Sequence, residues 1–293
     1  MAQTFKNIYS WGLLITLAIV WGSSFILMKR GLVVFDHLEV AQLRMAIAWL
    51  SLLPFVWRDL FSIDKKHLIP IIIVGLFGNG IPAFLFTKAQ TQIDSSFAGI
   101  LNALVPIFTF IIGVLIFKNS VKKIQVLGII TGLIGAVSLM TYGGLVMQNS
   151  HYSWYVIGAT LCYAISLNTI KYALQELSAL KIAGLAFFVV GPLCLGGLAF
   201  SDFLEKMQKH DGGLEALFYI FLLSTLGTSI ALVLFNQLVK QTSAIFASSV
   251  TYLIPIVAIF WGVIDGEPIT FWHFLSMAVI IVGILLVNKS KID

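Results

Sequence analysis

Ten apolar stretches with very few charges follow one another along the 293 residues of the chain. Each is close to the length, about 20 residues, at which an α-helix crosses the hydrocarbon core of a bilayer. We call them spans one to ten; they lie at 11–28, 37–57, 68–87, 95–117, 122–141, 152–172, 181–201, 216–238, 243–264 and 271–288. The sequence therefore predicts an all-α integral membrane protein with ten transmembrane helices.

The composition favours the same class. Hydrophobic residues make up 59% of the chain and charged residues 11%, and the mean hydropathy is +0.99. A soluble domain carries about a quarter charged residues, so this chain has too little polar surface to cover a globule in water. The alternation typical of an outer-membrane barrel is missing, because the apolar stretches are continuous. A soluble enzyme is thereby disfavoured.

Motifs for catalysis or for cofactor binding are not recognisable. Cys162 and Cys194 lie inside apolar stretches, and the five histidines lie near span ends without the spacing of metal ligands. The chain has no phosphate-binding loop and no recognisable Ser, His and Asp arrangement. The 18 Lys and Arg residues are scattered through short loops and form no basic run. We therefore expect no enzymatic activity, no cofactor, no metal and no nucleic-acid partner.

The distribution of basic residues predicts the orientation. If the N-terminus is cytoplasmic, twelve Lys and Arg residues lie on the cytoplasmic side and five on the other, with Arg44 inside span two. Cytoplasmic loops of membrane proteins carry the excess of Lys and Arg. We therefore predict a multi-pass protein of the cytoplasmic (inner) membrane with both termini in the cytoplasm.

The chain is duplicated. A shift of 149 positions places 78–114 on 227–263 and matches Phe86 with Phe235 and Pro106 with Pro255. This duplication predicts one transmembrane bundle built from two five-helix repeats, 1–148 and 149–293. Since five is an odd number, the second repeat is inverted relative to the first, as in alternating-access transporters with a site near the midplane.

Several short strings resemble a known family. They are Trp21-Gly22-Ser23-Ser24-Phe25, Glu39 with Ala41-Gln42-Leu43-Arg44, Ala103-Leu104-Val105-Pro106 with Gly113, and Tyr252-Leu253-Ile254-Pro255 with Gly262. In their order and in the duplication, the chain resembles the EamA-type transporters of the drug/metabolite transporter superfamily. The resemblance implies a cytoplasmic-membrane carrier of small metabolites, frequently an exporter, with amino acids prominent among its substrates.

Polar residues in spans three and eight indicate a substrate site. Asn79, Ala83 and Phe86 share one helical face of span three, and their repeat partners Thr228, Leu232 and Phe235 share one of span eight. Polar side chains in a bilayer tend to face the bundle interior or a cavity. We interpret both faces as lining a central cavity; the alternative is that Asn79 and Thr228 only bond neighbouring helices.

Spans four and nine each carry a proline. Pro106 and Pro255 free the carbonyl groups of Asn102 and Thr251, four residues earlier, at membrane depth. Because the kink occurs in both repeats, we favour a gating role for the prolines and a substrate-binding role for Asn102 and Tyr252. A fixed structural kink is the alternative.

Spans one and six add Trp21, Ser24, Tyr163 and Ser166 as substrate-binding candidates. An aromatic ring can cover an apolar part of a substrate, while hydroxyl groups satisfy its polar end. For Tyr163, packing inside the bundle with its hydroxyl on a backbone carbonyl is nearly as good an interpretation.

Arg44 lies about two turns into span two. Since an unpaired guanidinium there is costly, we expect it to reach the outer interface or to pair with Glu39 or Asp36. Binding of a substrate carboxylate is the alternative. With no carboxylate deep in any span, we expect an uncharged cavity that acts by shape and hydrogen bonding.

These observations predict a secondary transporter with one small-molecule site and membrane lipid around it. We expect a monomer, with a dimer left open. The alternative is a lipid-handling or binding membrane protein that does not turn over soluble solutes.

Overall fold

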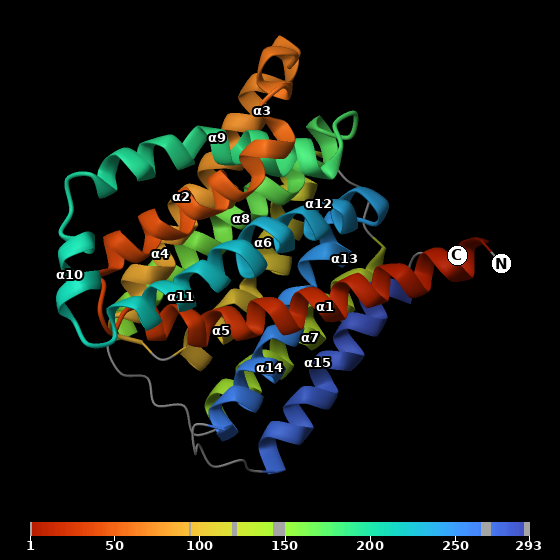
Figure 1. Cartoon of the computed structure of the whole chain (residues 1–293). Coiled ribbons are helices and arrows are strands. Elements are labelled where there is room, and N and C mark those ends of the chain that lie inside the picture. Colours follow the sequence, from red (N-terminus) through yellow and green to blue (C-terminus); the bar gives the residue numbers. More distant parts are fainter. Residues whose placement is uncertain (1, 94, 119–121, 143–149, 265–270, 290–293) are drawn as a thin grey trace.

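The computed structural model describes residues 2–93, 95–118, 122–142, 150–264 and 271–289 (Figure 1). All regular elements in these ranges are helices, which confirms the all-helical class. The predicted boundary between residues 148 and 149 lies outside the described residues.

Helices account for nearly all of the first half up to residue 142. They are α1 (Ala2–Gly31), α2 (His37–Val56), η1 (Asp59–Phe61), α3 (Lys65–Gly75), η2 (Leu76–Gly80), α4 (Ile81–Gln90), α5 (Ser95–Leu101), η3 (Asn102–Leu104), α6 (Val105–Leu115) and α7 (Lys123–Tyr142). Spans three and four are thus each assembled from consecutive helical pieces.

The second half follows a similar order. Its elements are η4 (Ser150–Tyr152), α8 (Ser153–Ala173), α9 (Ala179–Leu198), α10 (Phe203–Lys209), α11 (Gly213–Ser224), η5 (Thr225–Ile230), α12 (Ala231–Gln241), α13 (Ala244–Ser248), α14 (Val250–Ile264) and α15 (Phe271–Lys289). The short helix α10, in the connection between spans seven and eight, was not predicted from the sequence.

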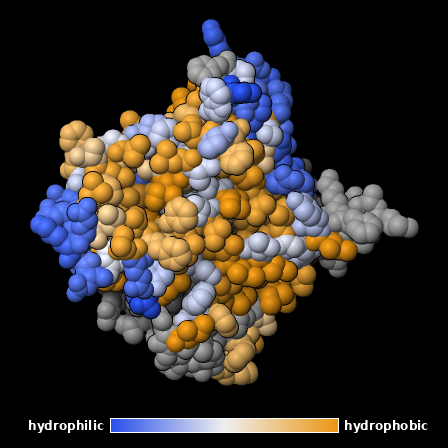
Figure 2. All heavy atoms as spheres, viewed as in Figure 1, coloured by the Kyte–Doolittle hydropathy of each residue, from blue (hydrophilic) through white to orange (hydrophobic). Residues whose placement is uncertain are grey.

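Five helical segments in the described residues are long and apolar enough to cross a membrane. They are Ile8–Gly31, His37–Val56, Lys65–Gln90, Ala179–Leu198 and Gly213–Gln241, and shorter apolar helices accompany them. Hydrophobic residues cover much of the face seen in Figure 2, and hydrophilic residues gather near α10 and near the start of α3. Large apolar side chains are exposed on the surface of the bundle, for example Ile15 on α1 and Leu193 on α9. This exterior suits lipid contact.

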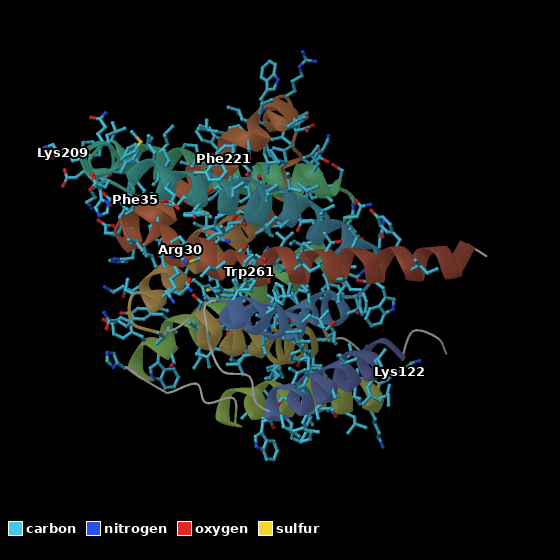
Figure 3. All side chains as sticks on the ribbon, turned by 60° about the horizontal axis from the view of Figure 1, so that its bottom comes forward. Arg30, Phe35, Lys122, Lys209, Phe221 and Trp261 are labelled. Atoms are coloured by element: carbon cyan, nitrogen blue, oxygen red, sulfur yellow. The ribbon has the colours of Figure 1, made fainter. Side chains whose placement is uncertain are left out.

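The two ends of the bundle are distinct. The beginning of α1 and the end of α15 lie at the same end, and α10 lies at the opposite one (Figure 1). Lys122 and Lys209 are likewise at opposite ends in Figure 3. The predicted placement of both termini on one side of the membrane is consistent with this arrangement.

Two matched helices contain a widened turn. Both η2 and η5 are π-helical, and a shift of 149 places Leu76 on Thr225, so the two turns begin at matched positions. A π turn inside an α-helix interrupts the regular ladder and is frequent at functional sites. The helical phase changes at these turns, so the residues that follow point in other directions around the helix axis than a regular α-helix would give.

Glycines bring α7 and α15 together. A Cβ atom added to Gly128 would lie 2.7 Å from the carbonyl oxygen of Gly283, and one added to Gly135 would lie 2.8 Å from Ile280. Small residues permit such a close approach of two helices. The glycine face of α7 is therefore covered by α15 of the same chain.

Candidate functional site: a cavity between the two halves

A cavity of about 1040 Å³, including its open mouth, lies inside the bundle. Residues before 142 and residues after 150 contribute to its wall almost equally. Nine of the predicted site residues line it: Trp21, Ser24, Asn79, Phe86, Asn102, Tyr163, Ser166, Thr228 and Phe235.

Two matched aromatic pairs form part of the wall. Trp21 of α1 meets Phe235 of α12 edge to face, with ring centroids 4.8 Å apart. Tyr163 of α8 stacks on Phe86 of α4, with centroids 6.0 Å apart. Phe86 and Phe235 are matched by the 149-residue shift, and Trp21 and Tyr163 come from the first helices of the two halves. Each pair therefore joins the first helix of one half to the third span of the other.

Serine and glycine make a second pair of matched contacts. Ser24 lies against Gly227, and Ser166 lies against Gly78, so closely that neither glycine has room for a Cβ atom. Trp21 also donates a hydrogen bond from Nε1 to the Gly227 carbonyl oxygen at 3.0 Å. These contacts fix α1 on η5 and α8 on η2 at the edge of the cavity.

The widened turns position one polar side chain each. Asn79 donates from Nδ2 to the Val74 carbonyl oxygen at 3.2 Å, and Thr228 donates from Oγ1 to the Leu223 carbonyl oxygen at 2.9 Å. Both bonds reach back five residues, to carbonyl groups at the π turn. The side chains thus satisfy backbone acceptors and are held at the cavity wall.

Amide oxygens without donors surround the cavity. The Oδ1 atoms of Asn79, Asn102 and Asn236 are buried and accept no hydrogen bond from the described residues. All three residues line the cavity. A buried acceptor without a donor is costly, and a bound molecule with N–H or O–H groups removes that cost when it satisfies the acceptor.

Arg44 also lines the cavity, which corrects two sequence predictions. Its Nε donates to Thr228 Oγ1 at 2.8 Å, and no salt bridge to Asp36 or Glu39 is formed. The guanidinium thus faces the interior of the bundle rather than the outer interface. The expectation of an uncharged cavity was wrong in this respect, because a permanent cation lies in its wall.

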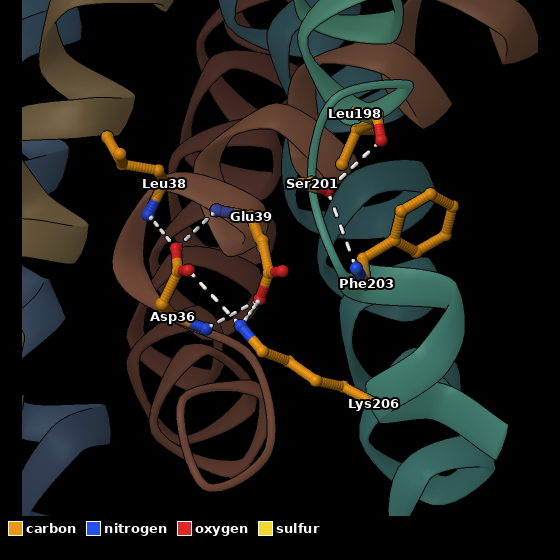
Figure 4. Close-up of polar contacts among 7 residues, drawn as sticks. All are labelled: Asp36, Leu38, Glu39, Leu198, Ser201, Phe203 and Lys206. Atoms are coloured by element: carbon orange, nitrogen blue, oxygen red, sulfur yellow. Dashed lines mark hydrogen bonds and ion pairs between the residues drawn. The ribbon is translucent and has the colours of Figure 1, made fainter. Parts of the chain in front are cut away.

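The two acidic residues expected near Arg44 bind a lysine instead. Lys206 of α10 donates from Nζ to Glu39 Oε2 at 2.7 Å and to Asp36 Oδ2 at 3.3 Å (Figure 4). Asp36 also caps α2, because its Oδ1 accepts from the backbone N–H groups of Leu38 and Glu39. The hydrogen bond to Glu39 raises the pKa of Lys206, although partial burial acts in the other direction. This ion cluster lies at the α10 end of the bundle.

Ala83 and Tyr252 lie outside the cavity wall. Ala83 packs with residues of α2 and α9 and does not line the cavity, whereas Leu232 at the matched position does. Tyr252 turns towards α7, where its ring contacts Gly132 and its hydroxyl donates to the Ile129 carbonyl oxygen at 3.2 Å. Both positions serve packing in this conformation.

The two prolines act on the backbone next to the cavity. Pro106 stands in the first turn of α6, after the short 3-10 segment η3 that contains Asn102. Pro255 lies inside α14, and the helix is interrupted between α13 and α14, just before Thr251. Spans four and nine are therefore both broken on the N-terminal side of proline, beside the cavity residues Asn102 and Thr251.

Asn236 and the two glycines were missed as site residues. Asn236 follows Phe235 and stands four residues after Leu232, so the helical period already places it near the polar face. Gly78 and Gly227 give no polar signal, and only their repeat match marks them. Arg44 could be recognised in the sequence as a charged residue inside a span. The direction of its side chain, however, depended on which hydrogen-bond partner the folded protein places within reach.

Helices with an apolar exterior that enclose a polar and aromatic cavity define a membrane protein equipped to bind a solute within the bundle. Residues 9–141 and 152–289 each match the EamA-like transporter family. The chain belongs to this family of membrane transporters, which confirms the resemblance seen in the sequence.

Two relatives align with most of this chain and with most of their own length. The chain is 25% identical to the uncharacterized inner membrane transporter YedA of Escherichia coli K12, over 96% of this chain and 90% of YedA. It is also 25% identical to the uncharacterized transporter YoaV of Bacillus subtilis 168, over 93% of this chain and 94% of YoaV. A solved crystal structure with 14% identity superposes with a TM-score of 0.73 over 96% of both chains. That structure shows that the fold is shared.

Proposed function

We propose that the protein is a secondary carrier which moves small metabolites, amino acids or related solutes, through this cavity by alternating access. We place it in the cytoplasmic membrane, as an exporter or exchanger with both termini in the cytoplasm. The observation that carries the proposal is that matched residues of both halves form one cavity wall.

The matched contacts support two inverted five-helix repeats. Trp21 with Phe235 and Tyr163 with Phe86 join matched elements twice, once in each direction between the halves, although the first pair is edge to face and the second is stacked. Ser24 with Gly227 and Ser166 with Gly78 repeat the relationship. In transporters with inverted repeats, rocking of one repeat against the other opens a fixed site to each side in turn. The broken spans at Pro106 and Pro255 are our candidates for the bending elements.

Counterflow in liposomes tests the carrier function. Purified protein is reconstituted in vesicles preloaded with one unlabelled solute, and entry of the labelled solute is followed for amino acids, nucleobases, sugars and monocarboxylates. We expect protein-dependent counterflow for at least one class. Failure with every solute contradicts the proposal and favours the lipid-handling alternative.

A matched pair of variants on α9 ties transport to the cavity. Ala186 is buried in the cavity wall, whereas Gly196 is exposed and an added Cβ meets nothing within 4 Å. Ala186→Leu is expected to reduce counterflow at least about tenfold by filling the cavity, and Gly196→Leu is expected to leave it unchanged. Equal rates in both folded variants contradict a route through this cavity.

A further inference from the structure

We infer that the cavity selects solutes that carry a carboxylate, and that Arg44 is the residue that binds this group. The inference rests on the proposed carrier function, because it assigns the substrate class of the same cavity. It also reverses the role expected for Arg44 from the sequence.

The first observation is the orientation of the guanidinium. Arg44 Nε donates to Thr228 Oγ1, which in turn donates to the Leu223 carbonyl oxygen at 2.9 Å. This chain of two bonds fixes one edge of the guanidinium on η5. No described residue accepts a hydrogen bond from Arg44 Nη1 or Nη2, and the residue lies in the cavity wall. The outer nitrogens are therefore available to a molecule in the cavity.

The second observation is the missing counter-ion. No Asp or Glu is among the described residues that line the cavity, and the nearby carboxylates of Asp36 and Glu39 are bound by Lys206. An ionised group inside a membrane protein is costly unless it is paired, and such groups mark substrate pathways. A ligand anion supplies the partner that the chain itself does not provide.

The charge and geometry favour a carboxylate. A guanidinium presents two parallel N–H donors that match the two oxygens of a carboxylate. Arg44 is the single Lys or Arg among the described wall residues, so one carboxylate neutralises it. A phosphate dianion would leave a net negative charge in a wall without a second cation.

The remaining wall describes the rest of the ligand. Trp21, Phe86 and Phe235 offer ring surface to an apolar body. Asn79 and Asn102 also line the cavity, and their buried amide oxygens have no donor among the described residues. A small water-soluble carboxylate with an apolar or aromatic body fits these three surfaces.

Binding of two nearly isosteric probes to the purified full-length protein tests the inference. We use 3-phenylpropanoate and its neutral amide, 3-phenylpropanamide, and measure Kd by calorimetry. The wild-type protein is expected to bind the carboxylate at least about tenfold more tightly than the amide, because the charged pair replaces a neutral contact. A carboxylate bound no more tightly than the amide, including binding of neither, overturns the inference. Tighter binding of oleate than of 3-phenylpropanoate also overturns it, since the site would then serve a lipid.

Variants of two arginines locate the effect. Arg44→Gln is expected to abolish the preference for the carboxylate while the amide still binds, and Arg44→Lys is expected to restore part of it. Arg58→Gln is the matched control, because Arg58 is exposed and stacks over Trp57, 5.3 Å from the ring centroid, outside the cavity. A carboxylate preference that persists in Arg44→Gln overturns the assignment of this residue.

Thermal melting without ligand separates a binding role from a structural one. Since the charge of Arg44 has no counter-ion among the described residues, Arg44→Gln is expected to melt at or above the wild-type temperature. A clear decrease in melting temperature shows a structural role and contradicts the inference. Carboxylate-selective binding without counterflow of any solute contradicts only the carrier function. Counterflow of neutral solutes alone, unchanged in Arg44→Gln, contradicts only this inference.

Discussion

Ser24 of α1 lies directly over Gly227 of η5, where a Cβ atom on the glycine would stand 2.5 Å from Ser24 Oγ. The contact joins the first helix of one half to the widened turn of the other. Its counterpart, Ser166 over Gly78, joins the halves in the opposite direction. Small residues at both places let the helices approach closely enough to form the edges of the cavity.

Because these contacts are so close, we expect that adding one methyl group at Gly227 strongly lowers the stability of the protein. Gly227→Ala is expected to destabilise the protein by about 1–3 kcal/mol, because the helices must separate or Ser24 must move. Gly12→Ala on α1 is the control, since an added Cβ there meets nothing within 4 Å. Thermal melting and counterflow are measured for both. Wild-type behaviour of Gly227→Ala contradicts the close contact.

Asn79→Ala is expected to weaken substrate recognition. It removes a polar group from the cavity wall, a loss of about 1–3 kcal/mol, which corresponds to about five- to 150-fold in apparent affinity. The control is Asn168→Ala, because Asn168 lies outside the cavity and donates to the Ala164 and Thr109 carbonyl oxygens at 2.9 and 3.1 Å. This control is expected to lower the melting temperature and to leave affinity unchanged. Normal affinity in folded Asn79→Ala would place the polar site on another helix.

Tyr163→Ala is expected to reduce affinity for solutes with an apolar or aromatic body. The change removes ring surface that stacks on Phe86, and because the ring is partly buried the loss is expected to stay below the roughly 3 kcal/mol of a fully buried aromatic ring. Tyr163→Phe is expected to bind normally, because no described residue bonds the Tyr163 hydroxyl and the ring is kept. Equal losses in both variants would assign the role to the hydroxyl.

Lys206→Ala is expected to lower the free energy of unfolding by about 1–3 kcal/mol, because Glu39, only 1% exposed, loses its charged partner. Lys209→Ala on the same helix is the control. Lys209 pairs with Glu205 at 2.7 Å, but both side chains are exposed, so we expect a change below about 0.5 kcal/mol. Melting of the two variants in detergent measures the difference, and equal stabilities contradict it.

The same cluster predicts a pH window. The bond to Glu39 raises the pKa of Lys206 above its ordinary 10.5, so this stabilisation is present below pH 10.5 and is lost as the pH rises through the raised value. Burial alone would raise the pKa of Asp36, but hydrogen bonds from Glu39, Leu38 and Lys206 lower it below 3.8. Its contribution is present above pH 3.8 and is lost as the pH falls further. The stability difference between wild type and Lys206→Ala is expected to shrink at both extremes.

Cysteine labelling tests the orientation. In a background with Cys162 and Cys194 replaced by alanine, a membrane-impermeant maleimide is expected to label Lys209→Cys in intact cells. Lys65→Cys is expected to react only after permeabilisation. Both lysines are exposed, so access depends on the side of the membrane. The reverse pattern would invert the predicted topology.

The helical fold and the family were readable from the sequence because the bilayer restricts the choice. Backbone groups in lipid must bond within their own segment, so apolar stretches of this length become helices whatever their neighbours are. The repeat match of Phe86 with Phe235 and of Asn79 with Thr228 identified cavity residues in both halves, since the same local pattern occurs twice.

The directions of individual side chains depended on the packing of helices that are distant in the sequence. Tyr252 and Ala83 share faces with cavity residues in a regular helix, but α7 accepts the tyrosine ring at Gly132, and α2 and α9 cover the alanine. Sequence periodicity gives the face of a helix and not the helix that will cover it. The widened turns η2 and η5 also change the phase that a constant period assumes.

The sequence by itself determined that the chain is a duplicated, helical membrane protein with polar residues inside its spans. Only the tertiary structure decided that Arg44 faces the cavity, because it brings Thr228 within reach of Arg44 and Lys206 of a distant helix within reach of Glu39 and Asp36. A charged side chain in a low-dielectric interior is stabilised by a polar or charged partner. Which partners lie close enough is set by the packing of the whole bundle.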